Sequence, residues 1–292
     1  MSEDKMKIII TGATGYIGRH LVAALCSQYE IYAIVREKTD ISYVKQFLKE
    51  TIIYDHNTIY DEIKKINPDL LIHLAGVFYG EHSKENILDL LESNIVFASV
   101  VLDSAVNAGV KKIINTGTYW QQYNGEIYNP VNLYAATKQA VEDILLYYIK
   151  AENCKAITVQ IFDTYGPDDD RKKILNIISN LEDGEQIDMS GGEQKLYYCY
   201  IDDIVNGYLR AIFLLNEMDF GEYKKYSLRE KKPIYLKEIV REYLEIHSKA
   251  VDIKWGGKPY RKREIMDPTG IGTILPGWNP EYNLQKGLKN IK

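Results

Sequence analysis

The stretch Lys7-Ile-Ile-Ile-Thr-Gly-Ala-Thr-Gly-Tyr-Ile-Gly18 decides the fold of this chain. Its first five residues form an apolar run that is typical of a strand buried inside a parallel sheet. Glycines follow at positions 12, 15 and 18, where a helix over 18–27 is expected to begin. Because glycine lacks a Cβ atom, the backbone of such a turn can come close to another group. The stretch therefore predicts a strand, a tight turn and a helix in direct succession.

Strand-like and helix-like segments alternate outward from this stretch through the first half of the chain. Short apolar strands separated by helices are typical of α/β proteins with a doubly wound parallel sheet, the Rossmann fold. The predicted strands cover residues 31–35, 51–54, 70–74, 112–116 and 156–161, and the further predicted helices cover 60–66, 84–107 and 134–150.

The pattern changes after residue 165, where polar loops and shorter elements replace the regular alternation. The sequence divides into a Rossmann domain over 1–162, to which 196–216 return, and a smaller C-terminal α+β lobe over 163–292. Because ligands bind at the carboxyl ends of parallel strands, the two parts should enclose a cleft there. The predicted elements of this half are helices over 174–181 and 236–246, a strand over 197–201, and a helix capped by Asp202 that ends near 215.

The 292 residues carry a net charge of −5 and 46% hydrophobic residues, which is ordinary for a soluble globular chain. This charge argues against a nucleic-acid-binding protein, because no broad basic surface is implied. No apolar run approaches the ~20 residues that a membrane span requires, and no signal peptide is expected. Three scattered cysteines predict neither a disulfide framework nor a metal site. We expect a cytoplasmic protein without a metal.

The turn after the first strand is also a candidate phosphate site. The N–H groups and the positive dipole end at a helix N-terminus attract a pyrophosphate. The spacing Gly-x-x-Gly-x-x-Gly differs from the commoner Gly-x-Gly-x-x-Gly, and a plain strand-to-helix turn is the alternative. We expect a dinucleotide here, contacted by Gly12, Thr14, Gly15, Tyr16, Ile17, Gly18 and Arg19.

The residue that follows the second strand bears on which dinucleotide binds. An acidic residue there would accept hydrogen bonds from ribose hydroxyls and favour NAD, whereas Arg36 suits a 2′-phosphate. Arg19 could add a second positive charge, and a solvated surface arginine is the alternative. We therefore expect a preference for NADP(H), with NAD(H) as the second choice. Further cofactor contacts are expected from Leu74, Ala75, Gly76 and Ile161 at strand ends, and from Asp55 to the adenine.

The run Tyr134-Ala-Ala-Thr-Lys138 carries the predicted chemistry. Positions i and i+4 share one face of a helix, so a phenol and an ammonium there can act together. The cation should lower the pKa of Tyr134 and make it a usable proton donor and acceptor. Thr116, at the end of the fifth strand, can share a carbonyl oxygen with that phenol. We predict Thr116, Tyr134 and Lys138 as the catalytic set.

These motifs and their spacing resemble the extended short-chain dehydrogenase/reductases, in the NAD-dependent epimerase/dehydratase branch that acts on sugar nucleotides. The resemblance covers nearly the whole chain and includes Tyr165-Gly-Pro167, Tyr200-Ile-Asp-Asp203 and Gly277-Trp-Asn-Pro280. Within the branch, Gly191-Gly-Glu-Gln194 and Glu264-Ile-Met266 look most like the CDP-abequose and CDP-paratose synthases. Those enzymes reduce a 4-keto sugar on CDP.

The resemblance implies roles for individual residues. Tyr134 would give a proton to O4 of the sugar, Lys138 would hold the nicotinamide ribose, and Thr116 would orient the carbonyl. A homodimer formed through the helices over 84–107 and 134–150 is also implied. Substrate contacts are implied for Thr116, Thr118, Tyr134, Asp163 and, at the pyrophosphate, Arg261.

Three positions depart from the pattern of the branch. Gln160 and Asp163 stand where its members usually carry arginine and asparagine, and Leu196-Tyr197 replaces an Arg-Asp pair. An aspartate near a diphosphate is repulsive unless it is bonded or protonated. The phosphate contacts, and with them the nucleotide, therefore stay open: CDP is favoured, and dTDP, GDP and UDP are the alternatives.

The residues around the fifth strand narrow the reaction. Gly117 and Thr118 stand where a 4,6-dehydratase of this type carries an acidic pair, so elimination lacks its acid and base. Two activities remain: one-way reduction of a C4 ketone by NADPH, giving an activated deoxysugar for surface polysaccharide, and NAD-dependent 4-epimerisation. Arg36 and Arg19 favour exchangeable NADPH and hence the reductase, because epimerases keep NAD bound. A non-catalytic dinucleotide-binding protein is the third hypothesis.

Overall fold

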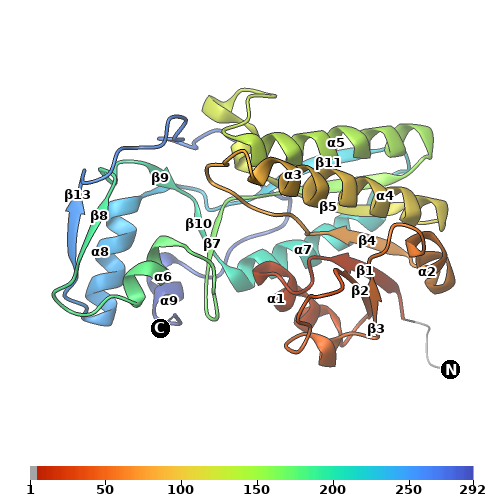
Figure 1. Ribbon diagram of the computed structural model, residues 1–292, viewed down its shortest axis with the longest axis horizontal. Coiled ribbons are helices and arrows are strands. Elements are labelled where there is room, and N and C mark those ends of the chain that lie inside the picture. The colour runs from red at the N-terminus through yellow and green to blue at the C-terminus, as the bar shows by residue number, and fades with distance from the viewer. Residues whose placement is uncertain (1–4, 292) are drawn as a thin grey trace.

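The computed structural model describes residues 5–291 and consists of two lobes that lie side by side (Figure 1). The larger lobe is built on a seven-stranded parallel sheet with the order β11-β6-β5-β4-β1-β2-β3. The strand order reverses between β1 and β4, the kind of position where doubly wound sheets bind ligands. The expected fold class is thereby confirmed. The strands are β1 (Lys7–Thr11), β2 (Glu30–Val35), β3 (Glu50–Ile53), β4 (Leu70–His73), β5 (Lys112–Thr118), β6 (Lys155–Ile161) and β11 (Tyr223–Leu228).

Helices cover both faces of this sheet because its inner strands are apolar on both sides. Ile8 and Ile10 pack on one face with α1 (Tyr16–Leu25) and α7 (Ile201–Glu217). Ile9 packs on the other face with three helices, and all three isoleucines are fully buried. Each such burial stabilises the fold by about 1.5–3 kcal/mol. The helices of that second face are α2 (Ile59–Ile66), α4 (Phe97–Asn107) and α5 (Leu133–Ala151).

The long helix predicted over 84–107 is present but irregular. It consists of α3 (Asn86–Leu91), a π-helical stretch over Glu92–Val96, and α4. Such π-helical turns are rare and occur frequently at functional sites. Within residues 5–291, no helix has the length and hydropathy needed to cross a bilayer.

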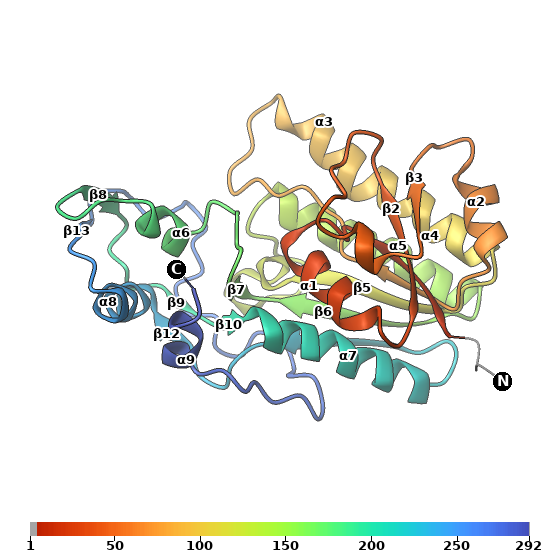
Figure 2. The ribbon, with the colours of Figure 1, turned by 90° about the horizontal axis from the view of Figure 1, so that it is seen from below.

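The smaller lobe consists of short strand pairs and three helices (Figure 2). β7 pairs with β10 and β8 with β13 in parallel, whereas β9 and β12 are antiparallel. The elements are β7 (Asp163–Tyr165), α6 (Ile174–Ser179), β8 (Gln186–Met189), β9 (Lys195–Leu196), β10 (Tyr198–Tyr200), β12 (Ile234–Tyr235), α8 (Leu236–His247), β13 (Asp252–Trp255) and α9 (Leu284–Leu288).

Two sequence-based expectations differ from the structure, one on the boundary between the lobes and one on a helix cap. β11 is an edge strand of the main sheet, paired with β6, although its residues were assigned to the smaller lobe. Asp202 is not the cap of α7, because the helix begins at Ile201 and Tyr200 precedes it. The next carboxylate, Asp203, instead accepts hydrogen bonds from the backbone of Glu281 (2.7 Å) and Tyr282 (3.1 Å). The first turn of α7 thus anchors the C-terminal segment.

Candidate active site

The glycine turn between β1 and α1 is as tight as the sequence predicts. Gly12 has φ of +72°, and a Cβ there would lie 2.7 Å from the backbone nitrogen of Ala75. A Cβ on Gly18 would overlap the Gly12 carbonyl oxygen, which also accepts a hydrogen bond from the Gly15 amide at 3.1 Å. Glycine is required at both ends of the turn, and the backbone is left accessible to a ligand.

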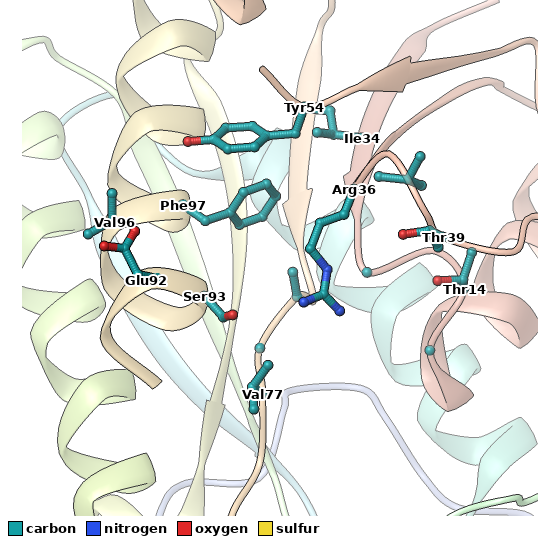
Figure 3. A pocket seen from close by; sticks show the side chains of 15 residues that line it. Thr14, Ile34, Arg36, Thr39, Tyr54, Val77, Glu92, Ser93, Val96 and Phe97 are labelled. Carbon is teal, nitrogen blue, oxygen red and sulfur yellow. The ribbon is translucent and has the colours of Figure 1, made fainter. Parts of the chain in front are cut away.

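A cavity of about 360 Å³ opens in front of this turn (Figure 3). Six of the predicted cofactor residues line it: Gly12, Thr14, Gly15, Arg36, Ala75 and Gly76. The aromatic walls, Tyr54 and Phe97, were not anticipated. The sequence placed Tyr54 at the end of a strand and Phe97 inside a long helix, where both were expected to serve the core. Their rings meet edge-on with centroids 4.7 Å apart. Tyr16, Ile17, Gly18, Arg19, Asp55, Leu74 and Ile161 do not line the cavity.

The two arginines proposed for a 2′-phosphate have different positions. Arg36 is exposed, and its side chain extends into the cavity (Figure 3). Arg19 instead hydrogen-bonds the Asp168 carbonyl, pairs with Asp170 and lies over the ring of Tyr43. The Arg19 guanidinium is therefore held by the segment after β7, and Arg19 is not among the residues that line the cavity.

Asp55 also has a local role in the structure. Its carboxylate accepts hydrogen bonds from the backbone of Asn57 (2.8 Å) and Thr58 (3.2 Å), just before α2. This is the Asx-turn geometry that commonly starts a helix. The predicted contact with adenine would have to compete with these bonds.

Lys138 lies close to the strand end that the cavity exposes. Its side chain is buried, and its ammonium donates a hydrogen bond to the Ala75 carbonyl at 3.1 Å. A Cβ on Gly76 would come within 2.9 Å of the same nitrogen, so this approach depends on glycine. Burial lowers the pKa of Lys138 to about 8, because its charge is removed from water.

Tyr134 lies in the first turn of α5, which the Asn132 side chain caps by accepting a hydrogen bond from Ala135 at 2.9 Å. The sequence predicted a lowered pKa for this phenol. The structure gives the opposite direction: burial raises the pKa of Tyr134 to about 12. The reason is that removal from water disfavours the phenolate.

Two threonines of β5 could supply the predicted hydroxyl. The Thr116 hydroxyl is buried and lies 2.7 Å from the hydroxyl of Tyr208 on α7. Thr118 is the last residue of the strand, and its hydroxyl accepts a hydrogen bond from the Trp120 amide at 3.3 Å. Both are on the same face of the strand, since side chains two residues apart point the same way.

Asn94, which sequence reasoning did not single out, connects the cavity wall to α5. Its side-chain oxygen accepts a hydrogen bond from the Val77 amide at 2.7 Å, and its nitrogen donates to the Val77 carbonyl at 3.0 Å. The same nitrogen donates to the Thr137 hydroxyl at 2.9 Å. Asn94 is buried in the π-helical stretch. It fixes the segment after β4 against the helix that carries Tyr134 and Lys138.

Two of the side chains that depart from the family pattern, Gln160 and Asp163, have hydrogen-bond or ionic partners within the fold. The buried Gln160 accepts a hydrogen bond from Ser227 at 2.8 Å and donates one to Gln122 at 2.9 Å. Asp163 accepts a hydrogen bond from the Tyr119 hydroxyl at 2.9 Å and pairs with Lys173 at 3.4 Å. The expected repulsion by Asp163 is thus offset by a cation that the sequence analysis did not identify.

The other predicted substrate residue, Arg261, is exposed in the C-terminal lobe. Its guanidinium lies 5.2 Å from the centre of the Trp120 ring, in the turn that follows β5. Leu196, the third departure, pairs with Ile234 in the small β9–β12 ladder. Arg261 therefore contacts the turn after β5, whereas Leu196 is part of a strand pair within the smaller lobe.

Comparison with known proteins agrees with this geometry. Residues 8–223 match the NAD dependent epimerase/dehydratase family. The chain is 32% identical to a CDP-abequose synthase of Yersinia pseudotuberculosis, over 90% of this chain and 92% of that protein. It is 26% identical to a CDP-abequose synthase of Salmonella muenchen, covering 100% and 98% of the two chains. The UDP-glucose 4-epimerase of Thermus thermophilus, solved with NAD, has the same fold, with a TM-score of 0.82 at 19% identity over 98% of this chain and 97% of that one. This chain accordingly belongs to the NAD dependent epimerase/dehydratase family and is an NAD(P)-dependent enzyme of the oxidoreductase type.

Proposed function

We propose that this protein reduces the C4 ketone of a nucleotide-linked 4-keto-6-deoxy or 4-keto-3,6-dideoxy hexose, with NADPH as the reductant. The product is an activated deoxysugar for surface polysaccharide. Similarity to CDP-abequose synthases along nearly the whole chain supports a CDP-linked substrate over dTDP-, GDP- and UDP-linked ones. The choice of a reductase rests on Arg36 in the cavity wall. A guanidinium there suits the 2′-phosphate of NADPH, which is an exchangeable cofactor.

The residues present fit a dinucleotide. No Cβ can be accommodated at Gly12 or Gly18, so the turn offers bare backbone and a helix N-terminus to a pyrophosphate. The rings of Tyr54 and Phe97 form an aromatic wall suited to adenine. Lys138 would hold the nicotinamide ribose. When bound, the reduced nicotinamide supplies the hydride.

Tyr134 would supply the proton. Because burial raises the pKa of Tyr134 to about 12, the phenol stays protonated at neutral pH and can donate to O4. Lys138, whose pKa burial lowers to about 8, is mostly charged at pH 7 and would stabilise the developing oxyanion. A hydroxyl at the end of β5 would orient the carbonyl. The sequence favours Thr116, and the position of Thr118 as the last residue of β5 supports Thr118.

Other reactions of this fold have less support. Elimination needs an acid and a base beside the threonine, and neither Gly117 and Thr118 nor Tyr119 and Trp120 supplies a carboxylate. A 4-epimerase recycles a retained NAD, which Arg36 does not favour. A binding protein without activity would not require the pair formed by Tyr134 and Lys138.

The test is NADPH and NADH consumption by the purified protein with 4-keto-6-deoxy and 4-keto-3,6-dideoxy sugars on CDP, dTDP, GDP and UDP. We expect NADPH to be consumed with a CDP-linked ketone, and Tyr134→Phe to lose most turnover. Absence of consumption with nicotinamide cofactor retained through purification would support the epimerase instead. Unchanged turnover in Tyr134→Phe would contradict the role of this phenol.

A further inference from the structure

Two aromatic side chains outside the catalytic set form a chain of ring contacts that ends at Tyr134. The ring of Phe78, in the segment after β4, meets the Tyr134 ring edge-on with centroids 5.0 Å apart. The ring of Trp120, in the turn after β5, lies 5.5 Å from Phe78. Phe78 nevertheless remains 51% exposed. Exposure alone says little, since Phe213 on α7 is equally exposed. Phe78 differs because its ring contacts both the candidate proton donor and a second aromatic ring, so a ligand at Tyr134 would meet it.

Each ring of this aromatic pair has a cation near it. The Arg261 guanidinium lies 5.2 Å from the centre of the Trp120 ring, and the Lys173 ammonium lies 5.9 Å from that of Phe78. Lys173 also offsets the charge of Asp163 at 3.4 Å. An aromatic pair with a cation near each ring is complementary to a molecule that has an apolar ring face and an adjacent diphosphate.

We propose that Phe78 and Trp120 form the platform that receives the hexose ring, and that Lys173 acts with Arg261 on the diphosphate; this rests on the proposed function. The C–H face of a sugar packs well on an aromatic ring. A hydroxyl placed there loses water without gaining a hydrogen-bond partner. The platform therefore selects the sugar with fewer hydroxyls. An apolar site of this kind discriminates against one added hydroxyl by up to about 10²-fold.

Alanine variants of the aromatic pair provide the test. Phe78→Ala and Trp120→Ala should each lower kcat/KM for the CDP-4-keto-3,6-dideoxy sugar by about 10–100-fold and reduce its preference over the 6-deoxy sugar. Trp120→Phe should retain most of the activity. Phe213→Ala is the matched control, because Phe213 on α7 is equally exposed at 51%. NADPH affinity should stay within about twofold of wild type in all of them, since neither Phe78 nor Trp120 lines the cavity.

Lys173→Met should raise KM while leaving kcat nearly unchanged, because the diphosphate is held equally in the ground and transition states. Unchanged kcat/KM and sugar preference in Phe78→Ala would overturn the platform. Equilibrium binding of the CDP-linked deoxysugar distinguishes a failure of the platform proposal from a failure of the proposed function. If wild type reduces no ketone, the proposed function fails. Weaker binding by Phe78→Ala, but not by Phe213→Ala, would then still support the platform, and equal binding would overturn it.

Discussion

The ammonium of Lys138 on α5 lies 3.1 Å from the carbonyl oxygen of Ala75, directly after β4. This contact ties the helix that carries the candidate proton donor to the wall of the cavity proposed for the dinucleotide. It is possible because Gly76 has no side chain to occupy the space beside the ammonium. A cofactor bound along that wall would therefore meet a cation whose position is already set, which lowers the cost of ordering the site.

Reduction should lose rate as pH rises through about 8, because burial lowers the pKa of Lys138 to that value and the ammonium is discharged above it. The phenol should not contribute to this fall, since burial raises the pKa of Tyr134 to about 12. A kcat–pH profile measures the effect. Lys138→Met should lower kcat by about 10²-fold or more and abolish this limb. Lys150→Met, at the exposed end of the same helix, should leave the profile unchanged. If kcat of Lys138→Met still fell above about pH 8, the fall would belong to the titration of another group.

Substitution of the two β5 threonines by valine should separate a catalytic hydroxyl from a structural one. Thr118→Val should lower kcat by about 10–100-fold with little change in stability, because Thr118 ends the strand at the ligand edge. Thr116→Val leaves the Tyr208 hydroxyl without its buried partner and should cost about 1–3 kcal/mol of unfolding free energy. Steady-state kinetics and denaturant unfolding of both variants decide the matter. A larger loss of kcat in Thr116→Val would return the role to Thr116.

Arg36→Glu should shift the cofactor preference from NADPH toward NADH by at least about tenfold. The introduced carboxylate repels a 2′-phosphate and accepts hydrogen bonds from ribose hydroxyls. The measurement is the ratio of kcat/KM values for the two cofactors. Arg19→Gln is the control, because the Arg19 guanidinium is held by the Asp168 carbonyl and Asp170. If Arg19→Gln changed the ratio as much as Arg36→Glu, the assignment to Arg36 would be wrong.

Asn94→Ala should destabilise the protein and slow catalysis together. The change leaves the Val77 amide and carbonyl without their side-chain partner, at a cost of about 1–3 kcal/mol. It also releases the segment after β4 from α5, so kcat should fall. Asn107→Ala is a suitable control, because the Asn107 side chain donates its hydrogen bonds to Asp103 on its own helix. Thermal unfolding and kinetics of the two variants provide the comparison, and equal behaviour would exclude a positioning role for Asn94.

The sequence was sufficient to predict a strand where a local pattern of apolar residues determines the structure. The apolar runs over residues 8–10 and 70–72 predicted buried strands, because strands covered on both faces by helices are apolar on both sides. β11 was missed for the converse reason. As an edge strand it carries Lys224 and Lys225, and its apolar pattern is weak.

The site was less predictable, because its geometry depends on contacts between distant segments. Arg19 and Arg36 look alike in sequence, and only the fold brings the Asp168 carbonyl, 149 residues further on, to Arg19. The pKa of Tyr134 depends on how deeply it is buried, which helical spacing does not reveal. Asn94 stands out by its place in a π-helical turn, which is visible in the structure but not in the sequence.

The most direct test of the account is the fate of the hydride. NADPH deuterated at C4 of the nicotinamide would be incubated with the protein and a CDP-linked 4-keto deoxysugar, and the product examined by mass spectrometry and NMR. We predict one deuterium per product molecule, located at C4 of the sugar, with stoichiometric formation of NADP⁺. A C4-epimerised sugar nucleotide without label and without net cofactor oxidation would contradict reduction and establish epimerisation in its place.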